Sequence, residues 1–213
     1  MMSATPTLHV VDDDASFRIA IARLLRASGY QVVLHHSGEE FLERPPGGEP
    51  GCILLDIRMP GLSGLELQDR LQRMDSILPI VFLTGHADIS TSVRAIKAGA
   101  EDLLTKPVEK KVLLEAVERA LARYRERRAK QERLDRLRVL VATLTPRETE
   151  VFGLMVRGKL NKQIAYALET SERTVKAHRQ SIMQKLQVQS IAEAVSIAER
   201  LGIMATSPDS PVS

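Results

Sequence analysis

The amino-acid sequence predicts two domains in one chain of 213 residues: an α/β doubly wound five-stranded parallel sheet, followed by a small all-α domain. In the first half, short apolar segments alternate with segments whose apolar residues recur at helical spacing. After residue 144 only helical patterns remain. Between Val108 and Thr145 there is neither glycine nor proline, which indicates a continuous helical connection between the two domains.

Five strands can be placed in order in the first domain. The apolar segments predicted as strands are residues 8–11, 31–34, 52–55, 79–83 and 103–104. A helix follows each strand: Gly29 ends the first helix, Ser37 begins the second, and Gly99 ends the fourth in a left-handed cap. Strict alternation of strand and helix is typical of a parallel sheet that helices cover on both faces.

Capping residues mark the helices of the second domain. Thr145 and Glu148 have capping-box spacing, and Pro146 stands at the first helical position. Ser171 and Ser190 are predicted to cap two later helices. The chain is therefore divided into a first domain (1–122), a basic helical linker (123–143), a second domain (144–204) and a disordered tail (205–213), which is rich in Ser and Pro.

Charge and cysteine content narrow the function classes. Residues 1–122 carry 13 basic and 17 acidic residues (net −4), whereas residues 123–213 carry 17 and 10 (net +7), so a polyanionic partner is expected at the second half. No apolar run approaches the roughly 20 residues of a membrane span, and no signal-peptide pattern is present. Cys52 is the single cysteine and lies in an apolar strand pattern. These features predict a cytoplasmic protein that does not enter a membrane.

Polar residues at four of the predicted strand ends could meet in one cleft. Asp12 and Asp13 follow the first strand, Asp56 follows the third, Thr84 ends the fourth and Lys106 follows the fifth. In a sheet of strand order 2-1-3-4-5, ligands bind outside the carboxyl ends of the strands, where the first and third strands are neighbours. Clustered carboxylates repel one another unless a cation lies among them, and hard oxygen ligands favour Mg²⁺. Each residue alone is an ordinary loop residue, but the set predicts a cation site.

Four stretches of this domain resemble the receiver domains of bacterial response regulators. They are VVDDD (10–14), LLDIRMPGLSG (54–64), FLTGH (82–86) and AIKAGAEDLLTKP (95–107). The resemblance implies a flavodoxin-like receiver fold in the bacterial cytoplasm. It also implies that Asp56 accepts a phosphoryl group from a sensor histidine kinase, and that Asp12, Asp13, Asp56 and the backbone carbonyl of Arg58 bind Mg²⁺.

The resemblance further implies roles for the lysine and the threonine. Lys106 should pair with the phosphoryl oxygens, and Thr84 should move to hydrogen-bond them after transfer. A cis peptide bond is expected between Lys106 and Pro107. One position departs from the family pattern: Leu103 stands where better-studied receivers have the Tyr or Phe that pairs with the switch threonine. An aromatic switch is therefore not expected here.

The segment that begins with LTPRETEVFGLMVRGKLNKQIAYALETSERTVKAHRQ at Leu144 closely resembles the LuxR-type helix-turn-helix. Together with the receiver, it is similar to regulators of the NarL/FixJ class. The residues predicted to form its core are Val151, Leu154, Ile164, Leu168, Val175, Ile182, Leu186 and Val195. Thr170 stands where the pattern normally has an aliphatic residue, so packing under the turn should be weaker.

The outward face of the third helix of this domain is the predicted DNA-reading surface, with Arg173, Lys176, Ala177 and Gln180 at helical spacing. The resemblance assigns base edges in the major groove to Lys176, Ala177 and Gln180. Phosphate contacts position a protein on DNA without selecting a base sequence. The residues predicted to make them are Asn161, Lys162, Thr174, His178, Arg179 and Lys185. No second His or Cys stands at metal-ligand spacing from His178, so zinc is not expected.

These assignments lead to one hypothesis and two alternatives. Phosphorylation should remodel the surface around residues 88–122, so that receivers dimerise and the paired second domains bind double-stranded operator DNA and act on RNA polymerase. The protein would not be an enzyme beyond assisting its own phosphorylation and dephosphorylation. One alternative is a Mg²⁺-dependent phosphatase, with Asp12 as nucleophile and Asp14 as general acid. Another is a small-molecule-sensing regulator, but that needs an aromatic-lined pocket and the chain is only 3% aromatic.

Overall fold

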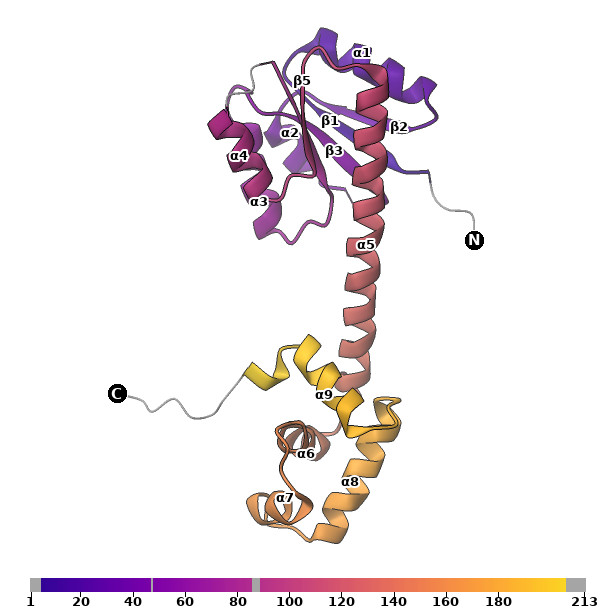
Figure 1. Cartoon of the computed structure of the whole chain (residues 1–213), viewed down its shortest axis with the longest axis vertical. Coiled ribbons are helices and arrows are strands. Elements are labelled where there is room, and N and C mark those ends of the chain that lie inside the picture. The colour runs from indigo at the N-terminus through magenta and orange to yellow at the C-terminus, as the bar shows by residue number, and fades with distance from the viewer. Residues whose placement is uncertain (1–4, 47, 86–88, 206–213) are drawn as a thin grey trace, which may run out of the picture. The chain divides into compact units, whose positions relative to one another are not determined.

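The computed structural model describes residues 5–46, 48–85 and 89–205. It divides into two units, residues 1–128 and 129–213 (Figure 1). The strands of the first unit are β1 (Thr7–Val11), β2 (Gln31–His35), β3 (Gly51–Asp56), β4 (Ile80–Thr84) and β5 (Asp102–Thr105). All four strand pairings are parallel and the order is β2-β1-β3-β4-β5, which confirms the predicted topology.

Helices cover both faces of the sheet. They are α1 (Ala15–Ala27), α2 (Gly38–Glu43), α3 (Gly64–Arg73), α4 (Ile89–Lys97) and α5 (Lys110–Ala142). Side chains from α1 and α5, such as Leu25 and Leu113, pack with Leu54 on one face. Side chains from α2, α3 and α4, such as Phe41 and Leu67, pack on the other face. Because successive strand residues point to opposite faces, strands buried on both sides are apolar at nearly every position.

The predicted helix ends are present in the first unit. Gly29 and Gly99 have φ of +91° and +80°, a conformation that favours glycine, and each follows the end of its helix. The Ser37 hydroxyl accepts a hydrogen bond from the Glu40 amide at the start of α2. A capping box between Ser63 and Glu66 at the start of α3 was not predicted. The caps at Ser37 and Ser63 bound the loops at the carboxyl ends of β2 and β3.

The second unit consists of helices, as predicted. After the last turns of α5 come α6 (Pro146–Val156), α7 (Asn161–Ala167), α8 (Glu172–Lys185), α9 (Ile191–Arg200) and the short 3-10 helix η1 (Ile203–Ala205). Thr145 and Glu148 form the predicted capping box, with Pro146 beside it. The expected disordered tail lies outside the described residues apart from its first residue, Ala205.

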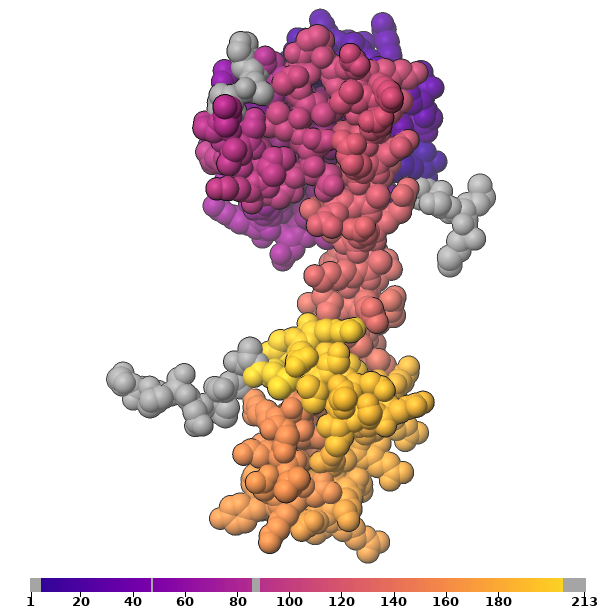
Figure 2. Space-filling view, viewed as in Figure 1, coloured from indigo at the N-terminus to yellow at the C-terminus, as the bar shows by residue number. Residues whose placement is uncertain are grey.

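One apolar cluster forms the core of the second unit. It contains all eight predicted core residues, of which Leu154, Leu168 and Val195 are partly buried. Phe152 and Met155 also lie in it, almost fully buried, although the sequence analysis did not name them. In Figure 2 one side of α8, coloured light orange, lies at the surface of this unit, while Val175 and Ile182 of the same helix are buried in its core.

Candidate functional site

Three carboxylates from two strand ends lie together in the first unit. Asp12 follows β1 and is 1% exposed, Asp56 ends β3 and is 8% exposed, and Asp13 is exposed. One carboxylate oxygen from each lies within 4.8 Å of the others. The strand register explains this meeting, because Val11 is the partner of Leu55 and the next residues in each strand direction are Asp12 and Asp56. Sequence reasoning predicted this cluster.

Lys106 joins two of the three acids. Its Nζ atom donates to Oδ2 of Asp12 at 2.6 Å and to Oδ2 of Asp56 at 3.0 Å, and its side chain is 17% exposed. The predicted cis bond between Lys106 and Pro107 is present. Thr84 is 1% exposed, and its backbone carbonyl accepts from the Lys106 amide at 2.8 Å. Four of the five predicted site side chains are therefore mostly withdrawn from solvent.

Burial and pairing set the charges of this cluster. Burial raises the pKa of Asp12, while hydrogen bonds from Lys106 and from the Asp14 amide oppose that rise. Burial by itself lowers the pKa of Lys106, but its hydrogen bonds to Asp12 and Asp56 outweigh burial and raise that pKa. The ammonium form of Lys106 thus partly neutralises a cluster that carries three carboxylates.

The phosphatase alternative requires Asp14 to act as a general acid in the cleft, but its carboxylate is engaged elsewhere. Its Oδ1 accepts hydrogen bonds from the Ser16 amide at 2.8 Å and the Phe17 amide at 3.1 Å, so it caps α1. These hydrogen bonds hold the carboxylate at the start of the helix, where it serves as the cap. The structure therefore speaks against Asp14 as a general acid.

The loop after β3 depends on a glycine whose role the sequence analysis missed. A Cβ atom on Gly64 would lie 2.1 Å from the backbone carbonyl oxygen of Asp56, closer than any side chain can stand. In the same loop the Arg58 amide donates to Oδ1 of Asp56 at 3.3 Å. Two signals could have found this position, namely the glycine itself and its place beside Ser63 at the start of a helix.

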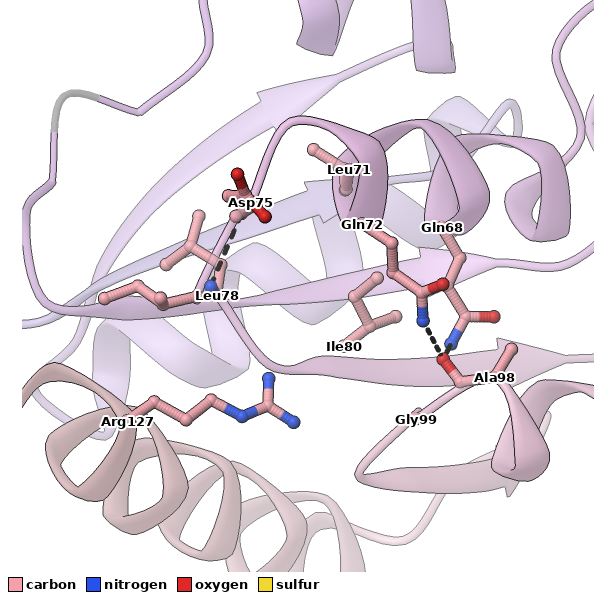
Figure 3. A pocket seen from close by; sticks show the side chains of 11 residues that line it. Gln68, Leu71, Gln72, Asp75, Leu78, Ile80, Ala98, Gly99 and Arg127 are labelled. Atoms are coloured by element: carbon pink, nitrogen blue, oxygen red, sulfur yellow. Dashed lines mark hydrogen bonds between the residues drawn. The ribbon is translucent and has the colours of Figure 1, made fainter. Parts of the chain in front are cut away.

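Leu103 and the end of α4 complete the description of the first unit. Leu103 is half-buried and packs against the core formed with α2, α3 and α4. Figure 3 shows a pocket of about 320 Å³ near Ile80, the first residue of β4. The cluster of Asp12, Asp13 and Asp56 lies at the opposite ends of the strands. In the pocket, Gln68 and Gln72 of α3 both donate to the carbonyl of Ala98, which ties the end of α4 to α3.

In the second unit, α8 exposes most of the predicted DNA-contact residues. Arg173, Thr174, Lys176, Ala177 and Gln180 are exposed, and His178 and Arg179 are half-buried. At the start of α7, Lys162 is exposed, and the Asn161 side chain accepts a hydrogen bond from Arg179 at 2.9 Å. A polar contact therefore joins the start of α7 to the middle of α8.

Lys185 is a predicted phosphate contact whose ammonium already pairs with a buried carboxylate of the same unit. It donates to Oε2 of Glu148 at 2.6 Å and to the carbonyl of Thr143 at 3.3 Å. Hydrogen bonds from Lys185, Ser181 and Thr145 lower the pKa of Glu148 to about 2. A DNA phosphate would have to share this lysine with a buried carboxylate.

Two family models match the chain. Residues 8–118 match the response regulator receiver domain, and residues 142–198 match the bacterial regulatory proteins of the luxR family. Among the residues that the structure describes, none of the helices combines the length and apolar character needed to cross a membrane.

Similar proteins of known sequence and structure cover nearly the whole chain. Nodulation protein W of Bradyrhizobium diazoefficiens is 42% identical over 95% of this chain and 89% of its own length. Transcriptional regulatory protein FixJ of the same species is 38% identical over 95% of this chain and 99% of its own length. The solved structure of the response regulator StyR is 47% identical, covers 92% of this chain and 100% of its own, and has a TM-score of 0.75. Full-length FixJ from B. japonicum is 36% identical, with coverage of 93% and 98% and a TM-score of 0.57.

Proposed function

The chain belongs to the NarL/FixJ class of response regulators, which join a receiver domain to a LuxR-type DNA-binding domain, and on that premise we propose how its two halves work. Regulation of transcription follows from this membership. Family membership also argues against the phosphatase and the small-molecule-sensing regulator, because the receiver match spans the part of the chain where either domain would lie.

In the proposed mechanism Asp56 is the phosphoryl acceptor. The bond between phosphorus and a histidine nitrogen of the sensor kinase breaks, a bond to a carboxylate oxygen of Asp56 forms, and the electron pair stays with the nitrogen. The observation that carries this proposal is the position of Asp56 among Asp12, Asp13 and Lys106. Lys106 can turn from the Asp56 carboxylate to the phosphoryl oxygens, and Thr84 lies at the adjacent strand end to hydrogen-bond them.

The same cluster fits Mg²⁺. Three carboxylates supply hard oxygen donors close together, and one lysine does not cancel their charge, so Asp12, Asp13, Asp56 and the backbone carbonyl of Arg58 would hold the ion. When bound, Mg²⁺ supplies positive charge that stabilises the transferred phosphoryl group. Beyond assisting its own phosphorylation and dephosphorylation, the chain is proposed to catalyse no reaction.

Dimerisation is the proposed response to phosphorylation. Exposed apolar side chains support the proposal that receivers pair through the surface around residues 88–122. Residue 88 itself lies outside the described residues. On α4, Ile89 is 84% exposed, Val93 45% and Ile96 49%, and Val112 on α5 is 40% exposed. Apolar side chains gathered on one surface favour association when a partner covers them. Two receivers that pair would bring two DNA-binding domains to one site at high effective concentration.

The second domain is proposed to bind double-stranded operator DNA in the cytoplasm and to act there on RNA polymerase. Lys176, Ala177 and Gln180 would read base edges from α8, with Arg173 on the same face. The proposed phosphate contacts are Asn161, Lys162, Thr174, His178, Arg179 and Lys185. The exposed basic groups of this surface support the proposal, and the internal pairing of Lys185 makes it the weakest of these contacts.

An Asp56→Asn variant tests the proposal. The parent, incubated with acetyl phosphate and Mg²⁺, should gain one phosphoryl group by mass spectrometry, form dimers in light scattering and bind DNA fragments more tightly. The variant should do none of these. Asp69→Asn is the matched control, since this carboxylate lies on α3, with only a long contact of 3.9 Å to Arg94, and should behave as the parent. Equal phosphorylation of parent and Asp56→Asn would refute the assignment.

A further inference from the structure

We propose that Phe17 is a positioning residue for phosphoryl transfer, because the face of its ring holds the ammonium group of Lys106 beside Asp56. The Nζ atom of Lys106 lies 4.1 Å from the centroid of the Phe17 ring. This inference rests on the proposed function, and it concerns how the lysine is held rather than which residue is phosphorylated.

The contact has the geometry and the environment of a cation–π interaction. An aromatic ring carries negative potential on its face and attracts an ammonium within about 6 Å of its centroid. The attraction is stronger where water is excluded, and the Lys106 side chain is 17% exposed. Asp12 and Asp56 occupy two of the three N–H groups of the ammonium. The ring is therefore a third partner of the same cation, beside the two carboxylates.

Hydrogen bonds of the acidic loop position the backbone of Phe17. Phe17 lies in the first turn of α1, and its amide donates to the capping carboxylate of Asp14 at 3.1 Å. The Asp14 amide in turn donates to Oδ1 of Asp12 at 3.0 Å. One short segment thus positions both a carboxylate partner and the aromatic partner of Lys106.

The role follows from what Lys106 must do during transfer. Lysine has a flexible four-carbon side chain, and its shorter bond, 2.6 Å, is to Asp12 rather than to the acceptor Asp56. Once Asp56 becomes an acyl phosphate, the Lys106 bond to that carboxylate is replaced by bonds to phosphoryl oxygens. The Phe17 ring contacts the ammonium on a side that the carboxylates do not occupy, and so restricts its motion while its hydrogen bonds change. Because the lysine is already positioned, less entropy is lost when the transition state forms.

Phe17 also packs against the core that α1 and α5 share, so simple packing is the competing explanation. Fluorination separates the two. Replacing Phe17 by 4-fluoro-, 3,5-difluoro- and 3,4,5-trifluorophenylalanine nearly preserves ring size and apolar character, while it steadily removes negative potential from the ring face. Trifluorophenylalanine at Phe152, buried in the second unit, is the matched control.

Two quantities should be measured on the full chain: the rate of phosphorylation by acetyl phosphate and the dissociation constant of beryllofluoride. We expect the rate to fall and the dissociation constant to rise step by step along the series, by about twofold to fivefold at trifluorophenylalanine and in Phe17→Leu. Phe17→Trp should phosphorylate at least as fast as the parent and bind beryllofluoride at least as tightly. In the unphosphorylated parent, NMR should show the ε-methylene protons of Lys106 shifted by the ring current, and Phe17→Leu should abolish that shift.

The outcomes are distinct. If Phe17→Leu is slow but the fluorinated series matches the parent, the ring acts by packing and the inference is overturned. An unshifted ε-methylene signal in the parent also overturns it. If the parent itself takes up no phosphoryl group, the proposed function fails and the inference with it, and the NMR shift then reports only a static contact.

Discussion

Lys185, in the last turn of α8, donates to the buried carboxylate of Glu148 at 2.6 Å, and this pair joins the end of the proposed DNA-reading helix to the start of α6. Ser181 donates to the other oxygen of the same carboxylate at 2.6 Å. The carboxylate also accepts from the Thr145 amide at 2.7 Å. One side chain thus joins the start of α6 to the second half of α8.

Replacing Glu148 by Gln should destabilise the second domain. The substitution removes the carboxylate partner of Lys185 and leaves it the longer contact to the Thr143 carbonyl, which costs roughly 1–3 kcal/mol in urea unfolding. Because the pKa of Glu148 is lowered in the folded state, to about 2, its contribution is present above the ordinary carboxyl pKa and is lost as pH falls from about 4.5 toward 2. Glu150→Gln is the control, since Glu150 pairs with Arg147 at the surface and should change stability by less than about 1 kcal/mol. Similar losses in both variants would argue against the bridge.

Gly64→Ala should disturb the phosphoryl-acceptor loop. The added Cβ would meet the Asp56 carbonyl at 2.1 Å, so either the loop moves or the domain loses about 2 kcal/mol or more. Both outcomes should lower the rate of phosphorylation by acetyl phosphate. Gly153→Ala, inside α6 with nothing within 4 Å of the new atom, should stabilise by about 0.5–1 kcal/mol. If Gly64→Ala had the stability and the phosphorylation rate of the parent, the loop would accommodate the extra atom and the prediction would be wrong.

Glu169→Gly should stabilise the second domain. Glu169 lies in the turn between α7 and α8 with φ of +51°, a left-handed conformation that costs a residue with a Cβ roughly 1–2 kcal/mol. Allowing for the greater freedom of glycine in the unfolded chain, the expected net gain is about 0.5–1 kcal/mol by thermal unfolding. The same change at Glu172, in the first turn of α8, should instead destabilise by about 1 kcal/mol. This turn also contains Thr170, the unusual polar residue.

A buried histidine pair should make the receiver sensitive to acid. Burial, and then the neighbouring charge of His35, lowers the pKa of His9 to about 4. Since the folded pKa is lower than the ordinary value of 6.5, the folded state resists protonation, and stability should fall as pH drops from about 6.5 toward 4. Urea unfolding at several pH values checks this. A His9→Asn variant should show a shallower decline, and an equal slope in parent and variant would contradict the prediction.

The periodicity of the sequence was sufficient to predict a parallel sheet, and the strand order typical of the doubly wound fold then placed the acidic residues together. Alternation of apolar strands and helices requires a parallel sheet, and in such a sheet the residues after the strands share one edge. Asp12, Asp56 and Lys106 could therefore be placed together without coordinates. Thr145 and Gly99 were likewise readable, because a cap needs only its own backbone neighbours.

Local patterns, by contrast, carry no information about which side chains approach across elements. The ring of Phe17 under Lys106, the carbonyl of Asp56 against Gly64, and the pairing of Lys185 with Glu148 each join residues at least 8 positions apart on different elements or loops. Only packing in three dimensions determined them, since a rotation of the helix that carries Phe17, Gly64 or Lys185 would break the corresponding contact while leaving the sequence pattern unchanged. The sequence alone therefore predicted which groups form the acidic cluster. The tertiary structure determined which neighbours position Lys106, Asp56 and Lys185.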